Sequence, residues 1–126
     1  FLILLLIACV EEQNSSTNIS TKSKGELLYE TNCLVCHMSN GEGIPGFFPP
    51  LSNSDYMLED IDRTIKTILY GSESPIIVNG ISYPGSTMNQ FDHLSNEDIA
   101  FVSTYILNAW GNDMGIVYPE MVDSNR

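Results

Sequence analysis

The sequence predicts a small all-α domain with three or more helices and one short β-hairpin. Apolar residues recur at intervals of three and four, which is typical of helices that bury one face. Two Ser-x-x-Glu or Ser-x-x-Asp signals indicate helix starts, and Asn79-Gly80 between β-branched residues indicates a two-residue hairpin turn. At 126 residues, the chain holds one domain at most.

The first eight residues are predicted to be the remnant of an export signal. Phe1–Ile7 is an apolar run too short to span a bilayer. The following Ala8-Cys9 completes Leu6-Ile7-Ala8-Cys9, which resembles the lipobox of bacterial lipoproteins. That resemblance implies that residues 1–8 are removed and that Cys9 carries a lipid. An ordinary signal peptide is the alternative, and both interpretations predict export to the periplasm or cell surface.

Residues 9–24 are predicted to be the lipidated cysteine followed by a flexible polar tether. The stretch from Gln13 to Lys24 is rich in Ser, Thr and Asn and shows no periodicity. An ordered strand is disfavoured because Ile19 is its single apolar residue. Fully extended, these 12 residues reach roughly 40 Å, so the domain could search for a partner beside a membrane.

The domain is predicted to begin near Gly25, with a first helix that Ser23 and Glu26 start as a capping box. Tyr29, Cys33 and Cys36 fall on one stripe of this helix. We therefore expect Tyr29 to pack on the same side as the two cysteines. The run Asn40-Gly41-Glu42-Gly43 is expected to end the helix.

The pentapeptide Cys33-Leu34-Val35-Cys36-His37 has the form Cys-x-x-Cys-His, the sequence mark of covalently attached c-type haem. At a helix end, this spacing brings two thiols and one imidazole to a single object. Each thiol can join a haem vinyl group as a thioether, and His37 can bind the iron while its other ring nitrogen is held by an acceptor. The prediction is one covalent haem c through Cys33 and Cys36.

Two other uses of this motif are open but less favoured. A thioredoxin-like redox pair expects a βαβ context, which the sequence does not show. Half a zinc site needs a second ligand pair, and no cysteine follows Cys36. With Cys9 assigned to lipid, no disulfide is required.

The loop from Ile44 to Leu51 contains three prolines and two phenylalanines. Such a segment can wall a flat ligand without regular structure, so Pro49, Pro50 and Leu51 are candidate cofactor contacts. The alternative is a simple turn with exposed rings.

A second and a last helix are predicted around the hairpin. The second helix ends at Gly71, and its apolar stripe is Leu58, Ile61, Ile65 and Ile68. The hairpin spans 76–83. The last helix opens with Ser95 and Asp98, stops at Gly111, and has the stripe Ile99, Val102, Ile106 and Trp110. The domain is expected to cover 25–118 and a polar tail 119–126.

The sixth ligand of the iron is predicted to be Met88. Met38 adjoins His37, Met57 precedes the second helix, and Met114 and Met121 fall in the polar C-terminal part. Met88 lies 51 residues past His37 in the loop between hairpin and last helix, which can cross the distal face. His93 is the competing ligand, since two histidines can also ligate haem iron.

The stretch from Gly25 to Tyr118 resembles the small class I c-type cytochromes, in particular the haem domains found alone or fused to copper nitrite reductases and other periplasmic oxidoreductases. The matching words are Gly25-x-x-x-Tyr29, Cys33-x-x-Cys36-His37, Gly41-x-Gly43-x-Pro45-Gly46, Phe48-Pro49-Pro50-Leu51, Val78-Asn79-Gly80, Met88 and Ala109-Trp110-Gly111-Asn112. The resemblance implies a small cytochrome c fold around one haem, with the first and last helices crossing near the haem edge. It also implies that Pro49 or Pro50 offers a carbonyl to His37.

The formal net charge is −11, which disfavours nucleic acid and anionic membrane surfaces as targets. A redox protein with a basic docking patch would be attracted to the chain, whereas the alternative is that the acidity serves solubility alone. Any membrane association is expected through the lipid on Cys9.

No acid–base pair or activated nucleophile is recognisable, so we expect an electron carrier and not an enzyme. The leading interpretation is a membrane-tethered monohaem cytochrome that carries single electrons between periplasmic or cell-surface redox partners. A fixed electron-transfer subunit of a larger oxidoreductase, such as a nitrite reductase, dehydrogenase or terminal oxidase, is the alternative. A haem-based ligand sensor or peroxidase is a third, and it would need an open sixth position.

Overall fold

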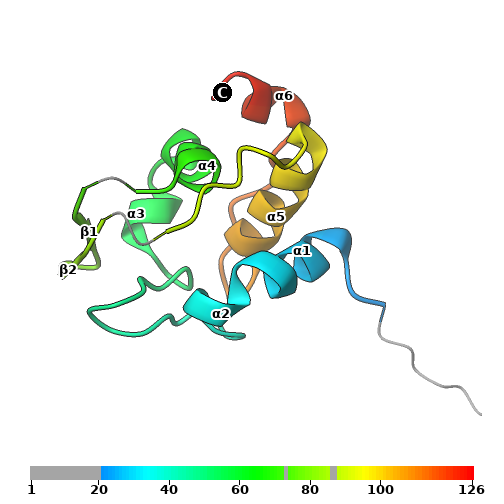
Figure 1. Ribbon diagram of the computed structural model, residues 1–126. Coiled ribbons are helices and arrows are strands. Elements are labelled where there is room, and N and C mark those ends of the chain that lie inside the picture. The colour runs from blue at the N-terminus through cyan, green and yellow to red at the C-terminus, as the bar shows by residue number, and fades with distance from the viewer. Residues whose placement is uncertain (1–20, 73, 86–87) are drawn as a thin grey trace, which may run out of the picture.

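The structure is a computed structural model that describes residues 21–72, 74–85 and 88–126. Over these residues it contains six helices and one two-stranded antiparallel sheet, as the sequence predicted (Figure 1). The elements are α1 (Lys24–Asn32), α2 (Leu34–His37), α3 (Asp55–Leu58), α4 (Ile61–Tyr70), β1 (Ile76–Val78), β2 (Ile81–Tyr83), α5 (Asn96–Asn108) and α6 (Pro119–Asp123). The predicted signal remnant, the lipidated Cys9 and residues 10–20 of the predicted tether lie outside the described residues, and the last residue of that tether, Lys24, begins α1.

Helix α1 packs against α5, the first and last helices of the predicted domain (Figure 1). At their contact, the buried Tyr29 ring lies 5.5 Å from the Tyr105 ring and 5.1 Å from the Trp110 ring, measured between centroids. Aromatic side chains bury a large apolar area, and tilted pairs at this spacing add to it. The rings therefore hold the two ends of the domain together.

The predicted serine caps are confirmed. The Ser23 hydroxyl accepts from the Glu26 amide, and the Ser95 hydroxyl accepts from the Asp98 amide, each at 3.1 Å. Each bond satisfies one of the amides that a helix N-terminus leaves without an intrahelical partner.

Two of the predicted helices are divided. The first breaks at Cys33, whose φ of −121° lies outside the α region, so α2 starts afresh with the haem motif. The second divides at Asp60, whose carboxylate accepts from the Arg63 amide and starts α4. Met57, expected just before a helix, therefore lies within α3 and is buried.

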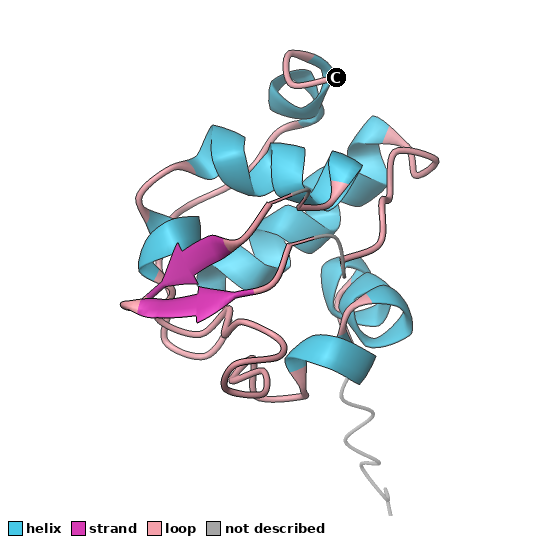
Figure 2. Cartoon of the chain, turned by 60° about the vertical axis from the view of Figure 1, so that its left-hand side comes forward, coloured by secondary structure: helices cyan, strands magenta, loops and turns pink. Residues whose placement is uncertain are grey.

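The predicted hairpin is present, with Asn79 and Gly80 at φ 50° and 79°. Positive φ at both positions is what the favoured two-residue turn requires. The turn is also tied to α3, because the Asn79 amide donates to the Asp55 carboxylate at 2.7 Å and the Asn79 side chain accepts from the Asp55 amide at 3.0 Å. Figure 2 shows the hairpin at one edge of the helical domain. A pair of three-residue strands would be marginal alone, so these bonds stabilise it.

The structure differs from the expectation of a polar tail at 119–126. This segment contains α6, which packs on α5 and buries Val122 completely. The Pro119 ring pre-sets the backbone for a helix start, and one apolar side chain directed at α5 is enough to anchor so short a helix. Sequence periodicity gave no signal because the helix has only five residues.

The core is formed by the facing sides of α1, α4, α5 and α6. Its fully buried members are Tyr29, Ile65, Leu69, Ile99, Leu107 and Val122. Among the described residues, no helix combines the length and the apolar character that crossing a membrane would require.

Candidate haem-binding site

A pocket opens among α2, the following loop, α3, α4, the hairpin, the segment around Met88 and α5. The space between its walls, including the mouth open to solvent, measures about 1160 Å³. No aspartate, glutamate, lysine or arginine of the described residues lines the pocket. The walls therefore suit an apolar macrocycle.

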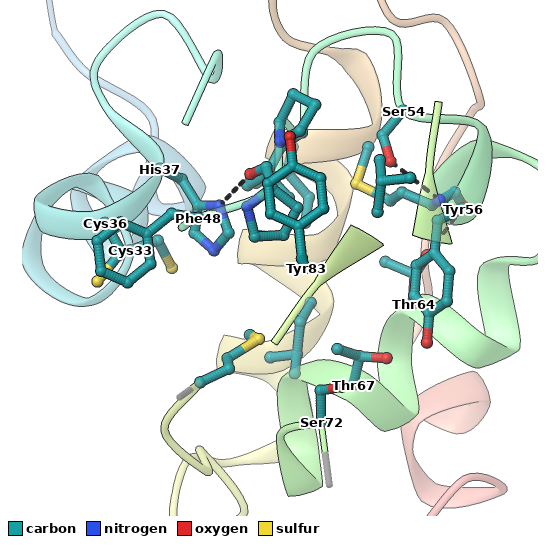
Figure 3. A pocket seen from close by; sticks show the side chains of 18 of the residues that line it. Cys33, Cys36, His37, Phe48, Ser54, Tyr56, Thr64, Thr67, Ser72 and Tyr83 are labelled. Carbon is teal, nitrogen blue, oxygen red and sulfur yellow. Dashed lines mark hydrogen bonds between the residues drawn. The ribbon is translucent and has the colours of Figure 1, made fainter. Parts of the chain in front are cut away.

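The two cysteines of the motif lie at one side of this pocket (Figure 3). Both are partly buried free thiols. Burial raises the pKa of Cys33 to about 12, and the neighbouring Cys36 adds to the effect. Before a ligand is attached, Cys33 is thus a neutral thiol near pH 7, in surroundings that do not activate it as a thiolate. The pair is placed to attach a ligand that fills the pocket.

His37 lies beside the cysteines with only 7% of its surface exposed. Its Nδ1 is 2.8 Å from the Pro49 carbonyl oxygen, so of the two prolines that the resemblance implied, Pro49 makes the contact (Figure 3). Burial lowers the pKa of His37, while the bond to Pro49 opposes that shift. A neutral ring that donates from Nδ1 keeps Nε2 as the nitrogen available to a metal.

The loop after α2 closes on itself and fixes the Pro49 carbonyl. The Gly43 amide donates to the His37 carbonyl at 3.0 Å, and the Leu51 amide donates to the Gly41 carbonyl at 2.7 Å. Gly43 has φ +61°, and a Cβ there would stand 2.3 Å from the Phe48 carbonyl oxygen. Only glycine fits this close approach. Pro50 and Leu51 also line the pocket, as expected from the sequence.

Met88 also lines the pocket, on a segment that follows the hairpin. It is half-buried and packs against the core. The competing ligand, His93, is exposed and does not line the pocket. The structure therefore brings the two predicted iron ligands, His37 and Met88, to one cavity from chain segments far apart in sequence.

Tyr29 does not lie on the side of the two cysteines, where the predicted stripe of the first helix placed it. It is absent from the pocket lining and packs between α1 and α5. Its hydroxyl donates to the Met38 carbonyl at 2.5 Å, immediately after His37. The break at Cys33 explains the change, because the stripe assumed one continuous helix. Burial raises the pKa of Tyr29, so its hydroxyl stays protonated and can donate.

Several pocket residues were not found by reading the sequence. Met57 is buried in α3 and lines the pocket as a second methionine. Hydroxyl-bearing side chains also face the cavity (Figure 3), namely Ser54, Tyr56, Thr64, Thr67, Ser72 and Tyr83. Ser54 and Thr64 bond locally, to the Met57 amide and carbonyl. The hairpin pattern alone could have indicated Tyr83, because alternate strand residues face one side.

A helical fold whose apolar pocket presents two thiols and a neutral imidazole defines a protein built for covalent haem. Comparison with known proteins agrees, since the family model described as Cytochrome c matches residues 23–110. The chain belongs to the cytochrome c family. It therefore holds one haem c through Cys33 and Cys36, and it is an electron carrier and not itself an enzyme.

Individual relatives support the same assignment. The chain is 38% identical over 95 residues to "Cytochrome c-552" of Thermus thermophilus, covering 72% of this chain and 71% of that protein. It is 28% identical over 93 residues to "Alcohol dehydrogenase (quinone), cytochrome c subunit" of Gluconobacter oxydans, covering 71% of this chain and 19% of that subunit. It is also 28% identical over 123 residues to "Fructose dehydrogenase cytochrome subunit" of Gluconobacter japonicus, covering 95% of this chain and 25% of that subunit.

Proposed function

We propose that the protein is a membrane-tethered monohaem cytochrome in which His37 and Met88 ligate the iron, and that it carries single electrons between periplasmic or cell-surface redox partners. The observation that carries the proposal is the meeting of these two residues at one uncharged pocket, beside the cysteines that attach the haem. The haem supplies the redox chemistry. The chain supplies position, exclusion of water and the two side-chain ligands.

Each residue at the site has a distinct part in this proposal. The Pro49 carbonyl holds His37 in one orientation and keeps the proton on Nδ1. The Met88 thioether is a soft ligand, and such ligation raises the reduction potential relative to two nitrogen ligands. With His37 and Met88 as ligands, the site would accept and release an electron with little rearrangement of the protein.

Three variants test the ligation. Met88→Ala should keep the covalent haem but lose the thioether signature from the ferric spectrum, bind carbon monoxide when reduced and show a lower potential. His93→Ala should leave spectrum and potential unchanged. Met57→Ala should lower the free energy of unfolding by about 2–3 kcal/mol, since it removes a buried side chain, without opening the iron. Carbon monoxide binding by the unmodified reduced protein would instead support a ligand sensor or peroxidase.

The proposed docking of a basic redox partner rests on charge. The net charge is −11, and two of the five basic residues are paired, Lys22 with Glu30 and Lys24 with Asp98. Near the pocket, the exposed side chains of Val35 (77% exposed) and Phe47 (67% exposed) are apolar. A partner that combines an apolar contact with a basic rim would complement this face.

Electron transfer measured over a range of salt concentrations tests the docking. The rate with a basic partner should fall steeply as salt rises, because long-range attraction is screened. A rate that is indifferent to ionic strength would remove electrostatic steering from the proposal while leaving the carrier role.

A fixed place in a larger oxidoreductase is the second candidate. It is favoured by the similarity to cytochrome subunits of alcohol and fructose dehydrogenases, of which this chain spans about a fifth to a quarter. Isolation of the native protein distinguishes the two. A free carrier should purify alone, whereas a subunit should keep its stoichiometric partner through crosslinking and size separation.

Tethering through Cys9 needs its own test. In cells that process lipoproteins, the mature protein should fractionate with membranes and incorporate labelled fatty acid. A Cys9→Ser variant should be released without losing haem. Equal membrane association of both proteins would exclude the lipid at Cys9.

A further inference from the structure

The backbone that follows Met88 is anchored first at Phe91. The Phe91 amide donates to the carbonyls of Ile68 and Leu69, at 3.1 Å and 3.2 Å. These carbonyls lie in the last turn of α4, where no intrahelical amide is available to them. The Phe91 side chain is buried and lines the pocket. Only two residues, Asn89 and Gln90, separate Met88 from this anchor.

The turn beyond Phe91 is held from outside by Arg126. The guanidinium donates to the Asp92 carbonyl at 2.8 Å, to the Leu94 carbonyl at 2.6 Å and to the Asn96 side-chain oxygen at 2.6 Å. Three donors of one planar group therefore bind three acceptors on five consecutive residues. The fixed geometry of the guanidinium makes this arrangement specific to arginine, because a lysine ammonium cannot reproduce it.

Arg126 is itself carried on an ordered element. The preceding Asn125 is buried, and its side-chain amide group donates to the Asp62 carboxylate in α4 at 2.9 Å and to the Met121 carbonyl in α6 at 2.8 Å. Val122 of α6 has no exposed surface. The chain end that bears Arg126 is therefore fixed against α4 and α5, and it can hold the turn at 92–96 in place.

We propose that Arg126 is a positioning residue for Met88: by holding the turn at residues 92–96 it keeps the Phe91 anchor seated and the Met88 thioether in the pocket. The inference rests on the proposed ligation by Met88. Without the guanidinium, the turn is joined to α6 by the weaker contact between the Asn96 side-chain amide group and the Asp123 carboxylate, at 3.3 Å. The segment then moves more freely, and Met88 leaves the iron more often.

Competition by imidazole for the sixth position of the ferric protein tests the proposal. Arg126→Ala should bind imidazole about three to ten times more tightly than the unmodified protein, because Met88 is displaced more easily. Arg126→Lys keeps the charge but not the fork of donors, so it should lie between the two. Lys66→Ala, which removes an exposed positive charge from α4, is the matched control and should bind imidazole as the unmodified protein does.

The imidazole titrations are made under conditions in which urea unfolding shows every variant to be fully folded. A loss of stability alone then does not change the measured imidazole affinity. Arg126→Ala with unchanged imidazole affinity, or Lys66→Ala with the same gain as Arg126→Ala, overturns the inference. Failure of the proposed ligation is seen separately, because Met88→Ala would then have the same spectrum and imidazole affinity as the unmodified protein.

Discussion

The two sides of the haem pocket are built differently. The side that carries His37 is one continuous stretch from Cys33 to Ser52, held mainly by hydrogen bonds within the stretch. Two remote side chains add to them, since the Trp110 indole donates to the Ser39 carbonyl and the Asn112 amide group donates to the Leu51 carbonyl, each at 3.0 Å. The side that carries Met88 depends on remote groups, since α4 carbonyls anchor Phe91 and Arg126 holds the turn beyond it.

This difference predicts which side of the pocket better withstands destabilisation of the fold. A loop that is closed by contacts between residues close in sequence loses little chain entropy when it forms. Those contacts remain as long as the loop stays folded. Contacts between distant segments depend on the docking of several helices and open at lower free energy. We therefore expect the Met88 side to respond first to destabilisation, and the His37 side to respond mainly to changes within its own loop.

The largest effect is expected from Gly43→Ala, on the His37 side. The new Cβ would stand 2.3 Å from the Phe48 carbonyl oxygen and 2.6 Å from the Pro49 carbonyl oxygen, the acceptor for His37. We expect the free energy of unfolding to fall by about 2–4 kcal/mol, because rigid backbone has to move and the residue has positive φ. Urea unfolding followed by circular dichroism measures this loss.

Gly46→Ala is the matched control for this substitution. Gly46 lies in the same loop with φ +78°, but no atom lies within 4 Å of a Cβ placed there. Its cost should be about 1–2 kcal/mol, from backbone conformation alone. If both alanines cost the same, the tight closure around Pro49 does not hold the loop.

The next effect is expected from Gly71→Ala, on the Met88 side. Gly71 has φ +74°, and a Cβ there would stand 2.6 Å from the Met88 carbonyl oxygen. The substitution should push the Met88 backbone away, so that the reduced protein binds carbon monoxide and stability falls by about 2–3 kcal/mol. Carbon monoxide titration followed by absorbance is the measurement.

Gly80→Ala is the control for Gly71→Ala. Gly80 has φ +79°, and no atom lies within 4 Å of its Cβ position. It should lose about 1–2 kcal/mol of stability and show no carbon monoxide binding. If neither Gly71→Ala nor Gly80→Ala binds carbon monoxide, Met88 is held more firmly than the comparison of the two sides implies.

The smallest effect is expected from Tyr29→Phe, which removes the donor to the Met38 carbonyl next to His37. The loss should be about 1–1.5 kcal/mol, the usual net worth of one hydrogen bond, and the haem spectrum should not change. Because burial raises the pKa of Tyr29, its share of stability is present at neutral pH and is lost as pH rises above roughly 10.

Tyr105→Phe is the control, since the Tyr105 ring packs on the rings of Tyr29 and Trp110 but its hydroxyl is not part of the bond to Met38. It should change stability by less than about 0.5 kcal/mol. A changed ferric spectrum in Tyr29→Phe would show that the His37 side is less self-contained than its local hydrogen bonds indicate.

The sequence by itself determined the cofactor, its two attachment cysteines, the all-α class, the serine caps and the hairpin. Each of these depends on residues within a few positions of one another: a five-residue motif, a side chain that caps an amide three residues later, and an Asn-Gly pair with positive φ. Such features are fixed by local sterics and hydrogen bonding, so they can be predicted without knowing the rest of the fold.

Only the tertiary structure decided which proline meets His37, that Tyr29 packs on α5 away from the pocket, and that Met57 joins the pocket wall. It also decided that 119–126 contains a helix and that Arg126 binds the turn beyond Met88. The contact of His37 with Pro49 joins residues 12 apart, and the other outcomes depend on contacts between segments farther apart in the sequence. Such contacts are favourable only once the helices have docked, and no local pattern records them.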